Sequence, residues 1–365
     1  MKFKIEKDQL LETLQKVQSI VAQRTTLPIL TNVLLEAKKG ALIFTTTDME
    51  VSLRTKIEVD IEVEGSTTLP ARRFFSICRD LPSHQVELTL EGDNENVIIK
   101  SGPFKGKLGG ISKDEFPEIP KFEEDLCYTL KQGTLRDILQ KTAYAASTEE
   151  SRPILNGALI SFKEEKLTAV CTDGRRLALI QHEMDLPEET NLEVVLPIKT
   201  VSELIKSLGT EGDVDIKMSS SQIAFDFDNN LIISKLIDGV YPDYNRVVPK
   251  QCEERICVDR EILHNAVRRV SLMLNDQSSA VQLDITENKI ELSTSSPEIG
   301  DANESIPVKY SGKDITISFN PTFLIAPLKN LESDEIFIEL SDGNSPGVIK
   351  SNIPFLYVIM PIRSQ

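Results

Sequence analysis

The feature that most constrains the fold of this chain is an internal repeat with a period of about 125 residues. The stretch FTTTDMEVSLR, which contains Asp48, is matched by VCTDGRRLALI, which contains Asp173, 125 positions later. Phe116-Pro117 and Tyr241-Pro242 are separated by the same interval. A chain of 365 residues has room for three such copies, so we expect three tandem modules.

Each copy shows the same order of helix and strand patterns. The opening stretches DQLLETLQKVQSIV, GTLRDILQKTAYAA and DREILHNAVRRVSLML carry apolar residues at helical spacing. Pro70, Pro197 and Pro321 each stand where a second helix would start. VELTL, DVDIKM, IAFDF and EIFIEL alternate like half-buried strands. The predicted fold class is α+β: three copies of a helix-strands-helix-strands module, covering residues 1–125, 126–250 and 251–365.

Two stretches of the first module have their own interpretation. KIEVDIEVE predicts one strand with Ile57, Val59, Ile61 and Val63 on its buried face and acidic residues on the other. GPFKGKLGG is interpreted as a hairpin. Its spacing is one residue short of a phosphate-binding Walker loop, and Leu108 stands where a magnesium-binding hydroxyl would be needed.

Charge is divided unevenly between the predicted helices and the rest of the chain. The stretches 7–24, 70–81, 131–147, 197–208, 259–270 and 320–331 carry +8 in total, which leaves −24 elsewhere for a net charge of −16. The division predicts a basic helical surface whose natural ligand is a phosphate backbone, read without sequence preference. The basic positions are Arg72, Arg73, Arg79, Lys131, Arg136, Lys141, Lys199, Lys206, Arg268 and Arg269.

Other features exclude several classes of protein. We find no apolar run long enough to span a membrane and no secretory leader, so we expect a cytoplasmic protein. Five scattered cysteines without a C-x-x-C pair argue against disulfides and zinc, and we interpret them as small core residues. No cofactor is indicated.

Nothing in the sequence favours catalysis. Asp213 and Asp215 share one face of a strand and suit magnesium in principle, but an acidic solvent face explains them as well. Two rival functions remain open: a magnesium-dependent DNA-processing hydrolase, and a repeat scaffold with no nucleic-acid role.

Six motifs in the same order carry a resemblance that covers the whole chain: the opening MKF, RTTLPIL, which begins with Arg24, PARRFFSICRDLP, TDGRRLAL, LIDGVYPDYNRVVP and VIMPIR. Together they resemble the bacterial DNA polymerase III β subunits, the sliding-clamp family. The resemblance implies a head-to-tail homodimer that closes into a ring around double-stranded DNA, with helices inside and sheets outside. It implies a processivity factor without catalysis. The implied partners are the DNA polymerase III α subunit, the clamp loader, other polymerases and repair proteins.

The resemblance also implies a groove between the second and third modules that binds short peptides, a glutamine followed by Leu or Phe. The groove residues would be Arg152, Leu155, Thr172, Gly174, Arg175, Arg176, Leu177, Pro242, Arg246, Val247, Val358, Met360, Pro361 and Ile362. Their composition, apolar with a polar rim, suits such a ligand.

Two further residue sets follow from the resemblance. The DNA-binding set is Arg24, Arg73, Glu149 and Lys199. Two residues depart from the family pattern: Glu149, where a polar or uncharged residue is common, and Ile198, which replaces a basic residue often found beside Lys199. Either departure would weaken phosphate contacts locally. The set expected at the dimer interface is Arg73, Ile77, Leu108, Leu272, Met273, Glu298 and Glu304, an apolar centre with charged edges.

Overall fold

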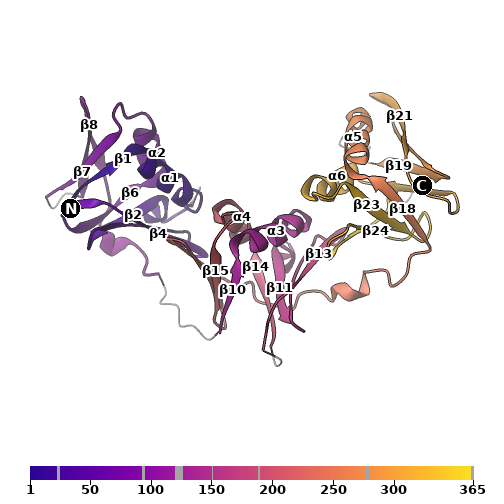
Figure 1. Ribbon diagram of the computed structural model, residues 1–365. Coiled ribbons are helices and arrows are strands. Elements are labelled where there is room, and N and C mark those ends of the chain that lie inside the picture. Colours follow the sequence, from indigo (N-terminus) through magenta and orange to yellow (C-terminus); the bar gives the residue numbers. More distant parts are fainter. Residues whose placement is uncertain are drawn as a thin grey trace. The chain divides into compact units, whose positions relative to one another are not determined.

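The computed structural model describes residues 1–22, 25–92, 95–119, 126–149, 151–187, 190–275 and 280–362 (Figure 1). The chain forms two compact units. Unit 1 contains Met1–Arg136 and Ser202–Leu236, and unit 2 contains Asp137–Val201 and Ile237–Gln365. Helices α3 (Gln132–Thr142) and α4 (Ile198–Ser207) each run from one unit into the other. Each unit therefore draws on more than one copy of the sequence repeat.

Unit 1 is built on two antiparallel sheets. One has eight strands in the order β10-β15-β16-β17-β4-β3-β2-β6, and the other has five in the order β5-β1-β7-β8-β9. Its elements are β1 (Lys2–Glu6), α1 (Lys7–Val17), η1 (Pro28–Thr31), β2 (Asn32–Lys38), β3 (Ala41–Thr47), β4 (Val51–Glu58), β5 (Asp60–Val63), β6 (Gly65–Pro70), α2 (Ala71–Arg79), β7 (Gln85–Glu91), β8 (Asn96–Ser101), β9 (Phe104–Gly109), η2 (Lys113–Glu115), β10 (Leu126–Lys131), β15 (Asp213–Met218), β16 (Gln222–Phe227) and β17 (Asn230–Lys235). Helices α1 and α2 pack against each other.

Unit 2 repeats this plan. An eight-stranded sheet has the order β14-β11-β12-β13-β25-β24-β23-β18, and a four-stranded sheet has the order β21-β20-β19-β22. The elements are η3 (Ala143–Ala145), η4 (Pro153–Leu155), β11 (Gly157–Lys163), β12 (Lys166–Thr172), β13 (Arg176–Glu183), β14 (Asn191–Pro197), η5 (Tyr244–Arg246), β18 (Glu254–Asp259), α5 (Arg260–Val270), η6 (Ser271–Met273), β19 (Val281–Thr286), β20 (Lys289–Ser296), β21 (Gly300–Pro307), β22 (Ile315–Phe319), α6 (Pro321–Asn330), β23 (Glu335–Leu340), β24 (Gly347–Lys350) and β25 (Phe355–Ile359). Helices α5 and α6 pack together.

Local sequence explains where the helices begin. Pro70 and Pro197 directly precede α2 and α4, and Pro321 is the first residue of α6, so the prediction of proline-led helices is confirmed. At α6 the Asn320 side chain accepts a hydrogen bond from the Thr322 N–H at 2.9 Å, which satisfies one of the unpaired donors of the first turn.

Two sequence predictions need correction. KIEVDIEVE is not one strand, because the chain leaves β4 after Glu58 and enters β5 of the other sheet at Asp60. The N–H of Val59 between them donates to the Gly40 carbonyl at 3.1 Å, so the pairing changes within an unbroken alternating pattern. The stretch 7–24 is helical only to Val17, where the Ser19 hydroxyl caps the Lys16 carbonyl. The hairpin prediction for GPFKGKLGG is confirmed by β8 and β9.

The cysteines are only partly core residues. Cys78 and Cys171 are buried, Cys252 and Cys257 are half-buried, and Cys127 is exposed, so the core interpretation is wrong for Cys127. Cys127 lies on β10, an edge strand in which solvent-facing and core-facing residues alternate. None of the described helices is long and apolar enough to cross a membrane.

The 125-residue sequence repeat is also present in the strand-pairing register of the two eight-stranded sheets. In unit 1, β4 and β17 pair with Val51 opposite Ser234. In unit 2, β13 and β25 pair with Arg176 opposite Ile359, each residue 125 positions later. Each eight-stranded sheet therefore contains the same seam, at which four strands of one copy continue into four strands of the next.

Candidate functional site

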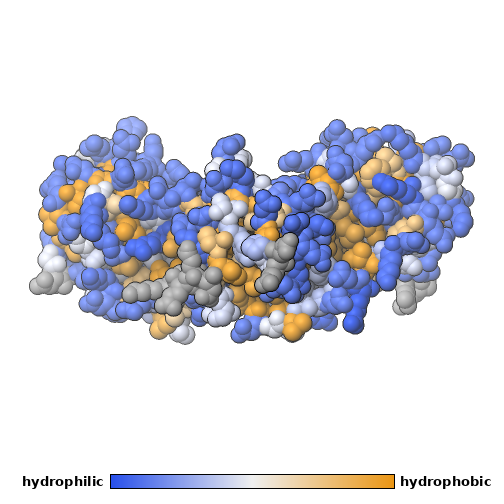
Figure 2. Space-filling view, turned by 60° about the horizontal axis from the view of Figure 1, so that its bottom comes forward, coloured by the Kyte–Doolittle hydropathy of each residue, from blue (hydrophilic) through white to orange (hydrophobic). Residues whose placement is uncertain are grey.

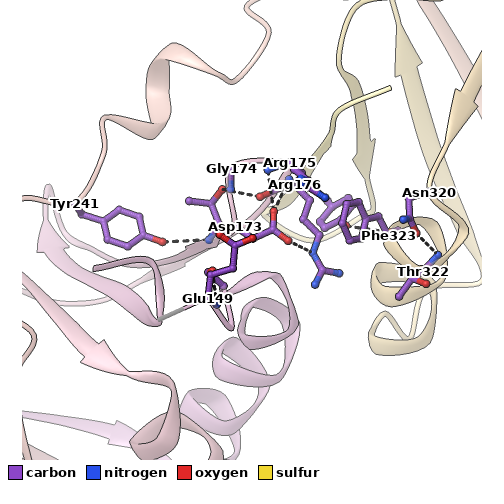
Figure 3. A network of polar contacts seen from close by, with 12 residues as sticks. Glu149, Asp173, Gly174, Arg175, Arg176, Tyr241, Asn320, Thr322 and Phe323 are labelled. Atoms are coloured by element: carbon purple, nitrogen blue, oxygen red, sulfur yellow. Dashed lines mark hydrogen bonds and ion pairs between the residues drawn. The ribbon is translucent and has the colours of Figure 1, made fainter. Parts of the chain in front are cut away.

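The turn that joins β12 to β13 in unit 2 is held by its own side chains (Figure 3). The Asp173 carboxylate accepts the N–H groups of Arg175 at 2.8 Å and Arg176 at 3.0 Å. The Thr172 hydroxyl accepts the Gly174 N–H at 3.1 Å and donates to the Arg176 carbonyl at 2.6 Å. Gly174 has φ of +86°, a conformation that favours glycine. The turn therefore presents a fixed backbone whose tip lacks a side chain.

Arg176 fastens this turn to its surroundings. Its Nε donates to the second Asp173 oxygen at 3.0 Å, and its guanidinium lies over the Phe323 ring of α6, 4.4 Å from the centroid (Figure 3). The Tyr357 hydroxyl donates to the Phe323 carbonyl at 2.8 Å, which fixes that part of α6 on β25. Burial raises the pKa of Tyr357, so the hydroxyl stays a neutral donor.

A buried apolar cluster forms the floor beside the turn. Leu155, Leu177, Tyr241 and Val358 belong to it, so three of the expected groove residues lie in one core. The Thr172 N–H donates to the Tyr241 hydroxyl oxygen at 3.1 Å, which joins the floor to the turn. Burial raises the pKa of Tyr241.

Exposed apolar residues occur in the same unit as this floor. The face drawn in Figure 2 is largely hydrophilic, with hydrophobic residues in patches. Among the described residues of unit 2, Val247 is 49% exposed, Met360 44% and Ile362 36%. The Met360 N–H donates to the Arg175 carbonyl at 2.9 Å, which places the end of β25 directly beside the turn. Pro242, Arg152 and Arg246 are exposed, and Pro361 is half-buried.

Unit 1 contains a second turn of the same construction, between β3 and β4. Asp48 accepts the N–H groups of Glu50 and Val51, and the Lys235 N–H donates to the Glu50 carbonyl at 2.9 Å, as Met360 does to Arg175. The side chains differ, however. Met49, with φ of +79°, replaces Gly174, and Glu50 replaces Arg175. The two seams thus share a backbone plan but not a surface.

The expected DNA-binding residues have diverse surroundings. Arg24 lies outside the described residues. Arg73 is exposed on α2 in unit 1. Lys199 is half-buried on α4, and Glu149 lies beside the Asp173 turn in unit 2 (Figure 3).

The basic helix residues differ in exposure and in ion pairing, whereas their charge alone predicts one exposed basic surface. Lys141 is buried and paired with Asp137, so the prediction that it belongs to a basic surface is wrong. It follows Asp137 by four residues, where ion pairs form readily on a helix. Other cations have acidic partners: Lys131 with Asp213, Lys206 with Glu203, and Arg269 with Glu304. Arg72, Arg73 and Arg268 are exposed and have no carboxylate within 4 Å among the described residues.

The residues expected at the dimer interface belong to the first and the third copies of the repeat. In unit 2, Leu272 is 73% exposed and Met273 37%, Glu298 accepts from Asn275 at 2.9 Å, and Glu304 pairs with Arg269. In unit 1, Arg73 and Ile77 line a cleft of about 710 Å³ together with Phe104. Leu108 is buried in unit 1, so only its backbone is open to a partner.

Sequence reasoning missed three residues of these surfaces. Phe323 lies under Arg176 of the turn, Asn320 caps the start of α6 (Figure 3), and Phe104 lines the cleft. The only signal for Phe323 was its place two residues after Pro321, which indicates the first turn of a helix but not what the side chain contacts. Phe104 was visible as an aromatic residue in a hairpin otherwise rich in glycine.

No metal centre is formed by the described residues, among which no cluster of three or more His, Cys, Asp or Glu side chains is found. Asp213 pairs with Lys131, and Asp215 accepts from the Thr129 hydroxyl.

Comparison with known families covers almost the whole chain. Residues 1–120 match the N-terminal domain of the DNA polymerase III beta subunit, residues 129–243 its central domain and residues 245–363 its C-terminal domain. The chain belongs to the DNA polymerase III beta subunit family. The three tandem modules are thereby confirmed as three clamp domains, and the chain is a sliding clamp of DNA polymerase III. This family is one of processivity factors without catalytic activity.

Individual relatives agree along their full length. The beta sliding clamps of Chlamydia muridarum and Bacillus subtilis are each 34% identical, over all of this chain and 99% and 100% of theirs. The crystal structure of the Bacillus subtilis clamp matches with a TM-score of 0.95, covering all of both chains. A Pseudomonas aeruginosa clamp bound to griselimycin matches with a TM-score of 0.94 at 30% identity, again over all of both chains.

Proposed function

We propose that two copies of this clamp close head to tail into a ring around duplex DNA, and that the surface beside the Asp173 turn binds peptides from its partners. The single observation that carries the ring is the repeated seam. Each seam continues one copy of the module into the next through paired edge strands, and the same pairing applied once more joins one chain to another.

The two smaller sheets have the strand orders expected of two half-sheets that have not been paired with each other. Placed end to end through β9 and β21, they give the order β5-β1-β7-β8-β9-β21-β20-β19-β22. Apart from the additional edge strand β5, that order repeats the eight-stranded sheet of unit 1, with β9 in the place of β17 and β21 in the place of β4. Both are edge strands within the described part of the chain. An edge strand offers unpaired backbone groups to a second chain.

The hairpins fix the register of the proposed pairing. Ser101 pairs with Phe104 across a two-residue turn, as Phe227 does with Asn230, so Lys107 corresponds to Ile233. Ile233 lies opposite Ser52 in the unit 1 seam. The other strand is counted from the two-residue turns that precede β3, β12 and β20. In that count Ser52 and Leu177 correspond to Asp301. The register therefore sets Lys107 of one copy opposite Asp301 of the other, a pair of opposite charges.

The side chains near these edges complement each other. The cleft lined by Arg73, Ile77 and Phe104 is open in unit 1, and Leu272 and Met273 are exposed apolar residues of unit 2. Inserting the second set into the first removes both apolar surfaces from water. Acidic Glu298 and Glu304 would stand near Arg73 at the rim, the division expected of a stable interface.

A cross-linking experiment tests the ring. Lys107→Cys and Asp301→Cys are combined in a Cys127→Ser background, because Cys127 is exposed, and the protein is treated with a short bis-maleimide linker. The register predicts covalent dimers on a denaturing gel, some of them doubly linked. Pairing Lys107→Cys with Glu304→Cys shifts the register by three residues and serves as the control. Equal yields from both pairs would contradict the proposed seam.

DNA inside such a ring needs only weak contacts, because topology retains it. Exposed cations such as Arg72, Arg73 and Arg268 would attract the phosphates, and salt would screen them. Protein loaded on a nicked circular duplex should stay bound through gel filtration and be lost when the circle is cut. Equal loss of the protein from intact circles would refute encirclement and would favour a scaffold protein that does not enclose DNA.

The peptide surface is proposed from the buried floor, the exposed Val247 and Met360, and the fixed turn at Gly174. Polymerase III, the loader and repair proteins are the proposed partners, through a glutamine followed by Leu or Phe. Replacing Met360 and Pro361 by alanine should abolish binding of a Gln-Leu-Leu-Phe peptide and leave dimerisation intact. Unchanged peptide affinity would refute the assignment.

A further inference from the structure

We infer that the groove selects peptides which carry acidic residues beside the apolar anchors, through Arg152 and Arg175. This inference rests on the proposed peptide groove and adds a charge requirement to it. It starts from a contrast between the protein as a whole, which carries a net charge of −16, and the Gly174 turn, beside which Arg152 and Arg175 stand.

The first observation is that Arg152 and Arg175 border the same small surface. A terminal nitrogen of Arg152 lies 3.4 Å from the point where a Cβ of Gly174 would stand, so the guanidinium covers the bare tip of the turn. Arg175 is the next residue, and its carbonyl is tied to the Met360 N–H at 2.9 Å. Both side chains are exposed. A peptide lying over Met360 and Gly174 would therefore pass between two cations.

The second observation is that neighbouring acids are already engaged. Asp173 accepts from the Arg175 and Arg176 N–H groups and from the Arg176 side chain, and Asp243 pairs with Arg246 at 3.0 Å. Among the described residues, neither Arg152 nor Arg175 has a carboxylate within 4 Å. Glu149 lies beside the turn (Figure 3), but it forms no ion pair with either arginine.

The third observation is the contrast with the equivalent seam of unit 1. There, 125 residues earlier, Leu27 stands in the place of Arg152 and Glu50 in the place of Arg175. The two turns share their hydrogen bonds to Asp48 and Asp173, and the carbonyls of Leu27 and Arg152 accept from the N–H groups of Leu30 and Leu155 in the same way, so the backbone does not require arginine at either position. The two positive charges therefore stand beside the turn of unit 2, where Met360 is exposed, and not beside the equivalent turn of unit 1.

The ligand that these features fit is a carboxylate on the peptide itself. Exposed ion pairs are worth little each, and rim charges act mainly on the association rate and on its dependence on salt. Acidic flanks should therefore raise affinity modestly and accelerate binding, while the apolar anchors supply most of the complex stability.

The test uses the full-length clamp and fluorescein-labelled peptides with a common Gln-Leu-Leu-Phe core. Pairs of Glu, Gln or Lys are placed before the core in one series and after it in another. In at least one series the Glu peptide should bind roughly 3- to 10-fold more tightly than the Gln peptide, and the Lys peptide should bind most weakly. The preference should shrink as salt is raised to about 0.15 M and beyond.

Arg152→Gln with Arg175→Gln should bring the ratio of Glu-peptide to Gln-peptide affinity to about 1, whatever affinity for the Gln peptide the variant retains. Arg255→Gln with Lys313→Gln removes two exposed charges from elsewhere in unit 2 and should leave the preference intact. Glu149→Gln should strengthen binding of the Glu peptide, because it removes a competing negative charge.

The outcomes separate the inference from the proposed groove. If no peptide binds the unaltered clamp, the groove itself is refuted. If all three flanks bind equally, or the preference survives in the double variant, the groove stands and the charge inference is overturned. If the double variant loses affinity for a short duplex instead, with peptide preferences unchanged, the arginines serve DNA and the inference is also overturned.

Discussion

The guanidinium of Arg176 lies over the ring of Phe323, 4.4 Å from its centroid, so a turn from the second module is packed on a helix of the third. The same arginine closes the turn through Asp173 at 3.0 Å. In the equivalent seam of unit 1 the position of Arg176 is taken by Val51, which has no charge for an aromatic partner. The groove turn is therefore fixed by a contact that the other seam does not contain.

Replacing Phe323 by leucine tests whether this contact positions the turn. The change keeps an apolar side chain of similar size but removes the ring face under the guanidinium, an interaction worth about 0.5–1 kcal/mol at exposed sites. We expect a Gln-Leu-Leu-Phe peptide to bind about 2- to 5-fold more weakly, mainly through faster dissociation, measured by anisotropy and stopped flow.

Phe337→Leu is the matched control, because Arg255 lies over Phe337 at 4.0 Å away from the groove. It should change thermal stability as much as Phe323→Leu and leave peptide affinity unaltered. Equal loss of affinity in both variants would show a general stability effect and not a local one.

The difference between the two seams also gives a substitution. Gly174→Met places at the groove the residue that unit 1 carries as Met49. Its side chain would meet the Arg152 guanidinium and cover the tip, and the positive φ would cost about 1–2 kcal/mol of folding free energy. Peptide binding should be lost while the dimer persists in sedimentation. The converse change, Met49→Gly, should leave peptide affinity as it is.

The sequence predicted the repeat, the helix starts and the fold class well, because these depend on local periodicity and on proline. It predicted Leu155, Leu177 and Val358 as one site only through a resemblance, since their contact joins segments about 200 residues apart. Lys141 shows the limit of summing charge along a helix. Its side chain is buried and paired with Asp137, and the composition of a helix does not say which of its charged side chains are buried. Phe323 and Phe104 were missed for the same reason.

Arg73 and Lys141 make a matched pair for the DNA surface. Arg73 is exposed, whereas Lys141 is buried and its pKa is lowered by that burial. Arg73→Gln should weaken retention on duplex DNA and reduce the slope of log affinity against log salt by roughly 1. Lys141→Gln should leave both quantities unchanged. A reduced slope for Lys141→Gln would contradict its inward position.

Cysteine reactivity offers an independent check of burial. Burial raises the pKa of Cys78 and of Cys171 to about 12, so at pH 8 almost no thiolate is present in the folded chain. Cys127 is exposed and should react with iodoacetamide first, with Cys78 and Cys171 modified only after unfolding in urea, as read by mass spectrometry. Raising the pH should speed modification of the two buried thiols only near their pKa. Fast labelling of Cys171 at pH 8 would contradict the packed core beneath the groove turn.

The last prediction concerns the exposed apolar residues of η6. Within the described part of the chain Leu272 is 73% exposed and Met273 37%, and the proposed ring would place them in the cleft beside Phe104 of the partner copy. Leu272→Asp with Met273→Asp should give monomers in sedimentation equilibrium, because burying two carboxylates against an apolar wall is strongly unfavourable. Ile262→Asp, also on an exposed apolar residue of unit 2, is the control and should remain dimeric. The monomeric variant should still bind the peptide, because the residues of the proposed groove belong to one chain. A dimer that survives the double change would place the interface elsewhere.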